Sequence, residues 1–387
     1  MSLRERLHAE ADGAWRSPRA VPSLWPAADD VDERLLKHTE RGAFWDTLAD
    51  AGVTLLVTRE YEHLLLALHA SRGGPVVSYL PLPHPSGIAF DRRRGVVHVA
   101  STRNPNQVHD LGPAVAAPPD VGARPIRLPD RPLVPIRMRL LPGATYLHDL
   151  AMVGGVLHGN AVGKNAVVRI DDDGATPVWW PKAVERRGGA QLDRNYLQLN
   201  SIAAGPTIRD SFFSASADAI GKRRPGDADF PVDRRGVVFS GRTREPIARG
   251  LTRPHSARLR REQIWVDNSG YGEVGICRDG KLDVVARPGG WTRGLGFAGG
   301  VAFVGTSRVL TRFKQYAPGL DPDRCVCGIH AIEIRSGKVL GSLIWPNGNQ
   351  VFAIEPVPAA WAGGLPAVAG RRRPEWERGL FYGFVTE

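Results

Sequence analysis

Short apolar segments, separated by glycine, proline, aspartate or asparagine, make up most of the chain from residue 53 onward. Examples are VTLLVT (53–58), GVVHVAS (95–101), NAVVRID (165–171) and QIWVDNSG (263–270). Segments of four to eight residues match the length of strands, and the small and polar residues between them favour tight turns. The pattern therefore predicts an all-β protein built from hairpins.

The first 52 residues follow a different pattern. Residues 1–30 are rich in proline and alanine, which predicts an extended arm. Residues 31–52 carry apolar side chains between Leu35 and Leu48 at intervals that suit one face of a helix. We therefore expect a single amphipathic helix here, ending at Gly52.

The strand pattern also repeats. Six segments share the order polar residue, short apolar strand, turn and second strand, and they begin at His84, His148, Asn200, His255, Arg293 and Gln350. Successive starts are 64, 52, 55, 38 and 57 residues apart. Repeats of roughly 40–50 residues are typical of β-propeller blades. Insertions within 101–132 and 221–235 explain why some intervals are longer.

The repeat predicts a six-bladed β-propeller. The last repeat is incomplete, and the strands within 53–82 have no inner strand of their own. We expect residues 53–82 to pair beside 351–357, which closes the ring and removes exposed sheet edges. The chain then divides into an arm and helix (1–52), the propeller (53–360) and a tail that packs on it (361–387). A two-sheet sandwich is the alternative, but it does not explain why one unit recurs.

Three stretches carry a resemblance to known proteins: PHSARLRREQIWVDNSGYGEVG (254–275), WTRGLGFAGGVAFVGTSR (291–308) and NAVVRID (165–171). They resemble a bacterial family of conserved hypothetical proteins that contains a domain of unknown function, over roughly residues 50–360. The chain is also distantly similar to propellers of the streptogramin-lyase and sugar-lactonase types. The resemblance implies a propeller fold and leaves the activity open.

The six repeat starts would converge near one mouth of the propeller channel. Three of them are histidines, His84, His148 and His255. Three neutral imidazoles around one axis suit a divalent transition metal with open coordination positions, although the pattern does not distinguish Fe, Zn, Cu and Mn. Solvated polar residues lining a wet channel are the alternative. Asn200 and Gln350 are expected to line the channel and contact the substrate.

Two further residues are candidates for catalysis. Arg293 occupies the channel-facing start of the fifth repeat, where its guanidinium cannot bind a metal but can hold a carboxylate or phosphate of the substrate. A structural ion pair with Glu273 or Glu355 is the alternative for Arg293. Glu273 follows a Ser-Gly-Tyr-Gly turn and could act as a general base at the mouth, or serve as an ordinary hairpin carboxylate.

Composition narrows the classes of partner and location. The formal charge is +11, but only seven of the 51 basic residues are lysines and the arginines are scattered, so we expect no nucleic-acid partner. No stretch of about 18 apolar residues exists and the N-terminus lacks an apolar signal core, so neither a membrane span nor secretion is expected. Three cysteines suit a reducing cytoplasm.

Together these features predict a metal-dependent enzyme with its active site in the propeller channel. The substrate is expected to be a small anionic metabolite or a peptide-like molecule, and a hydrolase or lyase is favoured over an oxidoreductase or oxygenase. A binding scaffold without catalysis is the alternative, since propellers also serve as rigid interaction platforms. The oligomeric state is left open by the sequence.

Overall fold

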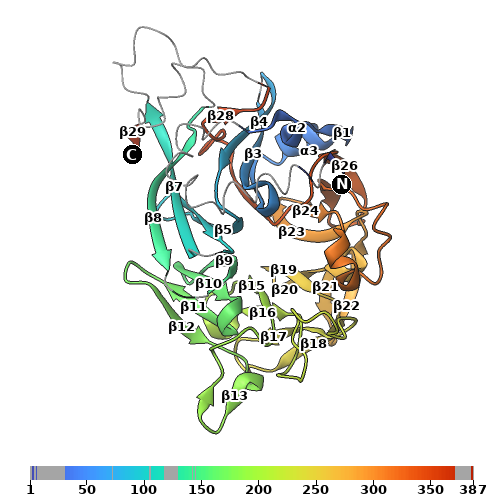
Figure 1. Ribbon diagram of the computed structural model, residues 1–387. Helices are drawn as coiled ribbons and strands as arrows, with labels where there is room; N and C mark the ends of the chain where they lie inside the picture. The colour runs from blue at the N-terminus through green and yellow to red at the C-terminus, as the bar shows by residue number, and fades with distance from the viewer. Residues whose placement is uncertain are drawn as a thin grey trace.

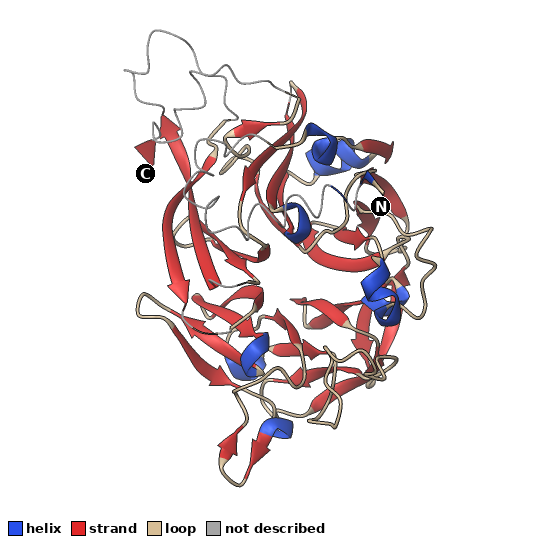
Figure 2. Ribbon diagram, in the orientation of Figure 1, coloured by secondary structure: helices blue, strands red, loops and turns tan. Residues whose placement is uncertain are grey.

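Six antiparallel sheets are arranged in a ring in the computed structural model (Figures 1 and 2), and the chain is a six-bladed β-propeller. The structure describes residues 2–3, 6, 31–71, 73–103, 106–116, 130–141, 143, 145–370 and 385–386. The first strand of each blade contacts the first strands of the two neighbouring blades, in the order β5–β9–β15–β19–β23–β27 and back to β5. The predicted fold class is therefore confirmed.

Blade 1 contains five strands and blades 2 and 3 contain four each, ordered from the inside outward. Blade 1 contains β5 (Pro85–Asp91), β6 (Val96–Ser101), β7 (Asn106–Ala116) and β8 (Leu133–Leu141), and β29 (Val385–Thr386) also pairs with β7. Blade 2 contains β9 (Leu147–Val153), β10 (Val156–Ala161), β11 (Ala166–Ile170) and β12 (Ala175–Trp179). Blade 3 contains β15 (Leu199–Ala203), β16 (Phe212–Ala215), β17 (Gly236–Ser240) and β18 (Pro246–Leu251).

Blade 4 also has four strands, whereas blades 5 and 6 have five. Blade 4 contains β19 (Pro254–Arg260), β20 (Gln263–Asn268), β21 (Glu273–Arg278) and β22 (Lys281–Ala286). Blade 5 contains β23 (Trp291–Ala298), β24 (Val301–Ser307), β25 (Gly328–Glu333), β26 (Val339–Ile344) and β1 (Thr39–Gly42). Blade 6 contains β27 (Ala353–Pro358), β2 (Val53–Arg59), β3 (Leu64–Ser71), β4 (Gly74–Pro81) and β28 (Ala367–Val368).

Short elements connect the strands. A small hairpin outside the blades is formed by β13 (Glu185–Arg186) and β14 (Gly189–Ala190). Single turns of 3₁₀-helix are η2 (Glu60–Glu62), η3 (Val162–Lys164), η4 (Lys182–Val184), η5 (Ile208–Asp210) and η6 (Ser269–Tyr271), and η7 (Thr311–Tyr316) is twice as long. Within the described ranges, no helix combines the length and hydrophobicity that crossing a bilayer requires.

The two ends of the chain close the ring, as the repeat pattern predicts. β27, from the end of the sequence, forms the inner strand of blade 6 and pairs antiparallel with β2, with Leu56 opposite Glu355. β28 completes the same sheet at its outer edge by pairing with β4. Strands from both ends therefore share one sheet, and unfolding either end would open the ring.

The single helix expected over 31–52 is wrong. Two short helices, α2 (Glu33–Leu36) and α3 (Phe44–Asp50), flank β1. Residues 39–42 pair with β26, the outer strand of blade 5, and Gly42 takes a positive φ of 67° as the chain turns into α3. Covering an exposed sheet edge stabilises this segment more than a continued helix would. The arm expected over 1–30 lies outside the described residues apart from residues 2, 3 and 6.

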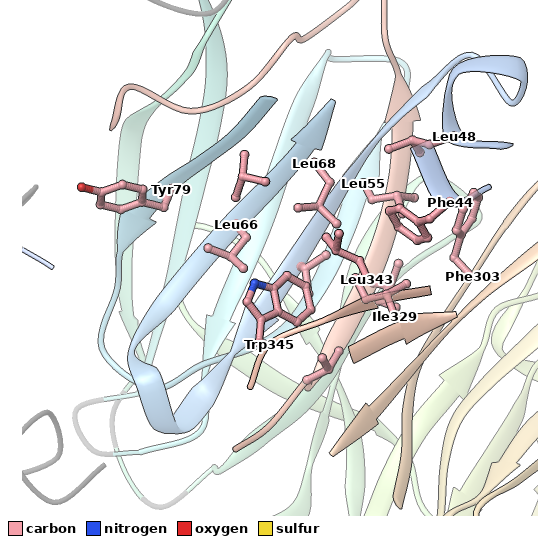
Figure 3. Close-up of a cluster of buried hydrophobic side chains, with 14 of the residues drawn as sticks. Phe44, Leu48, Leu55, Leu66, Leu68, Tyr79, Phe303, Ile329, Leu343 and Trp345 are labelled. Carbon is pink, nitrogen blue, oxygen red and sulfur yellow. The ribbon is translucent and has the colours of Figure 1, made fainter. Parts of the chain in front are cut away.

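The apolar face expected in this N-terminal segment is nevertheless buried. Phe44 and Leu48 of α3 pack between blades 5 and 6 (Figure 3), against Leu55, Phe303 and Leu343. Each blade junction contains a cluster of buried side chains from the facing sheets. The core of the protein is thus divided among the junctions between blades.

A polar contact accompanies the apolar packing at every blade junction. At each one, a hydroxyl or amide of one blade donates a hydrogen bond to a carbonyl on or next to the inner strand of the next blade. The six pairs are Thr58–Ser86, Ser86–Leu147, Asn160–Leu199, Asn200–Pro254, Ser269–Thr292 and Ser307–Val351. All six donors are buried, so each contact fixes one blade against the next in a defined register.

The inner strands share one irregularity. In blades 1 to 5 the pairing of the inner strand with its neighbour shifts register near one end, for example between His255 and Arg258 and between Thr292 and Leu295. Such a bulge bends the strand and interrupts the alternation of side chains between its two faces. It lies close to the residues from which the sequence predicts a site.

Candidate functional site

A pocket of about 290 Å³ lies where several inner strands begin. His148 of β9, His255 of β19 and Arg293 of β23 line it, together with Gln350 just before β27. These are four of the six repeat starts, and they come from four blades. The sequence predicts that the repeat starts lie close together, and four of the six do so in this pocket.

The other two repeat starts do not line this pocket. His84 precedes β5 in a left-handed conformation (φ 45°), its ring packs edge-on against His63 at 4.3 Å, and its Nδ1 lies 4.0 Å from Glu60 Oε1. Asn200 points into the junction of blades 3 and 4, where its Nδ2 donates to Pro254 O at 2.8 Å. The local backbone, rather than the position in the repeat, directs both side chains.

The structure does not assemble a metal centre from the predicted ligands. Among the residues that it describes, no group of three or more histidine, cysteine, aspartate or glutamate side chains is arranged to hold a metal ion. His148 and His255 face a pocket lined by arginines, and these cations disfavour a divalent metal. A transition metal on His84, His148 and His255 therefore stays a prediction from the sequence.

Glu273 lies outside the pocket. Its carboxylate pairs with Arg287 at 2.6 Å and accepts a hydrogen bond from Asn268 Nδ2 at 2.8 Å. These contacts join the ends of β20 and β21 to the loop after β22, which is what a carboxylate that stabilises a hairpin does. A role for Glu273 as general base is not supported by this placement. Glu273 is also not the structural partner of Arg293.

Arginine dominates the pocket wall. Four arginines and one glutamate line it, namely Arg103, Arg253, Arg293, Arg308 and Glu60. Arg253 and Arg293 are only 6% and 8% exposed. Neither forms an ion pair with a carboxylate within 4.0 Å in the part of the chain that the structure describes. Such buried guanidinium groups carry a large desolvation cost, and for Arg293 the more distant carboxylates of Glu60, Asp149 and Asp267 offset only part of it.

Arg253 is held by neutral groups. Its Nη1 donates to Gln198 Oε1 and to Pro225 O, and its guanidinium lies 4.3 Å from the ring centre of Tyr316. Burial lowers the pKa of Arg253 to about 10. The group therefore keeps its charge at neutral pH, and its positive potential acts on the pocket.

Arg293 is held in a similar way. Its guanidinium lies on the ring of Phe352 at 3.4 Å, and burial lowers its pKa to about 10. With the amide of Gln350 oriented so that oxygen faces arginine, Arg293 Nη1 donates to Gln350 at 3.0 Å and Gln350 donates to Glu60 Oε2 at 3.2 Å. Gln350 thus separates the buried cation from the buried carboxylate and fixes the guanidinium plane. Nη2 of Arg293 has no hydrogen-bond partner among the residues that the structure describes.

The residues Glu60, Arg253 and Asn349 belong to the pocket although the repeat pattern did not indicate them. Glu60 also accepts a hydrogen bond from Thr102 Oγ1 and lies 3.8 Å from Arg103 Nε. A weak sequence signal for Glu60 exists. The turns at 58–64, 160–166 and 268–273 each follow the second strand of a blade with one turn of 3₁₀-helix, and alignment of these turns would place Glu60 at the mouth.

Several buried polar atoms of the pocket residues have no hydrogen-bond partner among the described residues. Most of them are donors: Arg103 Nε, Arg253 Nε, Arg293 Nη2, Arg308 Nε and Trp291 Nε1. Buried polar groups are nearly always paired in native proteins, so an excess of free donors points to a partner rich in acceptors. The pocket is therefore complementary to an oxyanion.

The two pocket histidines are neutral. Burial, followed by the nearby charges of Arg293 and Arg253, places the pKa of both His148 and His255 well below the usual range. His255 Nδ1 lies 2.8 Å from Arg253 O, and a carbonyl only accepts, so this nitrogen carries the proton. The other nitrogen, Nε2, is then an acceptor. Negative charge brought into the pocket would raise both pKa values.

Aromatic rings complete the wall. Tyr61 and Phe313 stack with ring centres 6.2 Å apart, and Trp291 meets Phe313 edge-on at 5.8 Å. Phe313 belongs to η7, in the insertion between β24 and β25 of blade 5. The pocket thus combines aromatic and cationic side chains, which suits a site for a small organic molecule.

Comparison with solved structures finds other propellers. A chain of the nidogen/laminin complex is 11% identical over 79% of this chain and 98% of that chain, with a TM-score of 0.50. A gluconolactonase from Xanthomonas campestris is 15% identical, covering 76% and 86%, with a TM-score of 0.42. Streptogramin B lyase is 13% identical, covering 73% and 74%, with a TM-score of 0.37. These similarities concern the fold alone.

Comparison by sequence gives a single assignment. Residues 42–363 match the family described as "Domain of unknown function (DUF4915)". This match confirms the resemblance drawn from the three sequence stretches. No curated protein matches the chain.

Proposed function

The chain belongs to this DUF4915 family, and we propose that it binds a small organic anion, a carboxylate or phosphate, in the pocket at the channel mouth. One observation carries the proposal: Arg253 and Arg293 are buried beside a pocket and lack a carboxylate partner among the described residues. A ligand oxyanion would supply the missing counter-charge and accept hydrogen bonds from Nη2 of Arg293 and Nε of Arg253.

The size of the pocket limits the ligand. The cavity of about 290 Å³ lies at the lower end of the range of about 300–1,000 Å³ that is typical of small-molecule sites. A metabolite with one or two acidic groups suits a cavity of this size. The expected partner is therefore a small molecule, one of the two substrate types that the sequence predicts.

A second candidate function, acid–base catalysis on this anion, is favoured by the histidines. His148 and His255 line the same pocket as the arginines, and both are neutral in the free protein. A bound anion offsets the positive charge that lowers their pKa values, so either imidazole becomes a stronger base when the ligand is present. Proton transfer of this kind suits a hydrolase or lyase and requires no metal.

Isothermal titration calorimetry of the full chain tests the proposal. Glycerol 3-phosphate, glycerate and a series of simple carboxylates serve as probes, with the uncharged amide of each carboxylate as its matched control. We expect at least one acid to bind with a Kd below about 1 mM, equal to about −4 kcal/mol, and its amide to bind at least tenfold more weakly. Equal binding of acid and amide, or no binding of any acid, would contradict the proposal.

Proton NMR of the same mixtures separates the binding protein from the enzyme. New resonances from a product that increase with time indicate catalysis, and replacement of His255 by glutamine should abolish them while the acid still binds. Binding of an acid without any product among the probes supports the non-catalytic form of the proposal.

A further inference from the structure

Asn349 carries an unpaired amide beside the pocket. The residue belongs to the pocket lining, it is 1% exposed, and neither Oδ1 nor Nδ2 has a hydrogen-bond partner within the described part of the chain. A buried amide with both atoms unpaired destabilises the folded protein unless a partner enters. The arginines of the pocket do not supply this partner, because a guanidinium only donates and could pair with Oδ1 but not with Nδ2.

The backbone around Asn349 is fixed on both sides. Its N–H donates to the carboxylate of Glu62, and its C=O accepts a hydrogen bond from the N–H of Arg308 at 2.9 Å. Glu62 is itself paired with Arg59 at 3.2 Å, and the side chains of both are at most 1% exposed. The backbone of Asn349 therefore cannot move away from the pocket without breaking contacts with a buried ion pair.

The next residue connects this amide with the anion site. Gln350, the next residue in the chain, accepts from Arg293 of β23 and also lines the pocket, so Asn349 neighbours the residue that holds this guanidinium. A ligand whose acidic group reaches Arg293 is then expected to place a second group near Asn349. The chemistry of that second group follows from what an amide offers, namely one acceptor and two donor hydrogens.

A hydroxyl satisfies such an amide, because it donates to Oδ1 and accepts from Nδ2 at the same time. A second carboxylate would leave Oδ1 unpaired, and an ammonium group would leave Nδ2 unpaired and be repelled by the arginines. We infer that the ligand is a hydroxylated acid, with the acid on the arginines and a hydroxyl on Asn349. This inference rests on the proposed anion binding and specifies its substrate class.

Matched pairs of acids that differ in hydroxyl groups test the inference by calorimetry. Glycerol 3-phosphate is compared with propyl phosphate, and glycerate with propionate. The wild type should prefer the hydroxylated member by about tenfold or more, since a site built to bind a hydroxyl discriminates against its absence. In the Asn349→Leu variant this preference should vanish while propyl phosphate keeps its affinity. Asn347→Leu, in the same loop but outside the pocket lining, is the control and should keep the preference.

The outcomes separate this inference from the proposal beneath it. Acids that bind equally with and without hydroxyl groups, or a preference that survives in Asn349→Leu, overturn the hydroxyl contact and leave anion binding intact. Absence of any acid binding in the wild type overturns both. Circular dichroism of Asn349→Leu checks that it is folded, and retained binding of propyl phosphate shows that its pocket is formed.

Discussion

Replacing Arg293 with glutamine is expected to weaken binding of small acids by roughly 30- to 300-fold, equal to about 2–3.4 kcal/mol, because a charge-assisted hydrogen bond in a desolvated pocket is lost. The same change should not destabilise the free protein. Burial lowers the pKa of Arg293 to about 10, so the side chain stays charged at neutral pH, but its charged form is less stable in the folded protein than in the unfolded chain. Removing the charge relieves that cost and offsets the lost contact with Phe352.

Calorimetry for binding and urea unfolding for stability measure the two effects on the same variant. Arg287→Gln is the matched control, because Arg287 is exposed and pairs with Glu273 outside the pocket. It should leave acid binding unchanged. A variant of Arg293 that loses several kcal/mol of stability and keeps acid binding would show that this arginine is structural. Arg293→Lys, which keeps the charge and loses the planar fork, should weaken binding to an intermediate degree.

A second large effect is expected at Glu355, on the inner strand of blade 6. Burial raises its pKa to about 7, since the nearest basic side chain, Arg258, is engaged by Asp149 at 2.7 Å. The folded state then holds a proton that the unfolded chain releases near pH 4.3. Stability is consequently full below about pH 4.3 and falls as the pH rises toward 7.

Glu355→Gln removes this pH dependence. We expect the variant to be about 2 kcal/mol more stable than the wild type at pH 8. This value is smaller than the full pKa shift of Glu355 would give, because the side chain is only half-buried. At pH 5 the two proteins should differ in stability by less than about 1 kcal/mol. Urea unfolding at both pH values measures the difference. Glu245→Gln, at an exposed position, provides the control. Parallel pH profiles of wild type and Glu355→Gln would contradict the assignment.

The fold was accessible from the sequence because its determinants are local and repeated. Strand length, turn residues and the recurring polar residue before each inner strand predict six blades, and the unpaired strands at the two ends predict closure through β2 and β27. The N-terminal segment was not accessible in this way. Its helical spacing is real, but the edge of blade 5 captures residues 39–42 as β1, and no local pattern encodes that distant partner.

The candidate site was predicted in part. Position in the repeat correctly brings His148, His255, Arg293 and Gln350 together. It fails for His84 and Asn200, because the positive φ of His84 and the bulges near the inner strand ends change which way a side chain points. An alignment of the repeats does not reveal a bulge or a single left-handed residue, and therefore it does not predict these side-chain directions.

The charge balance of the site was also beyond the sequence. The histidines at the repeat starts suggest a metal site. The electrostatic potential of the pocket, however, depends also on arginines that are not repeat starts. Arg253 stands two residues before His255, and Arg308 follows β24. Arg253 and Arg293 are buried without a carboxylate partner in the described part of the chain, which is a property of packing, and this feature favours an anion over a cation.

Anomalous diffraction from crystals soaked in sodium selenate is the most direct test of an anion site in this pocket. Selenate offers tetrahedral oxygens like phosphate, and selenium marks its position without a refined ligand. Our account predicts a selenium peak in this pocket, placed so that selenate oxygens lie about 3 Å from Nη2 of Arg293 and Nε of Arg253. The peak should be absent from crystals of Arg293→Gln. Peaks confined to arginines on the outer surface, or a metal signal among His84, His148 and His255, would contradict it.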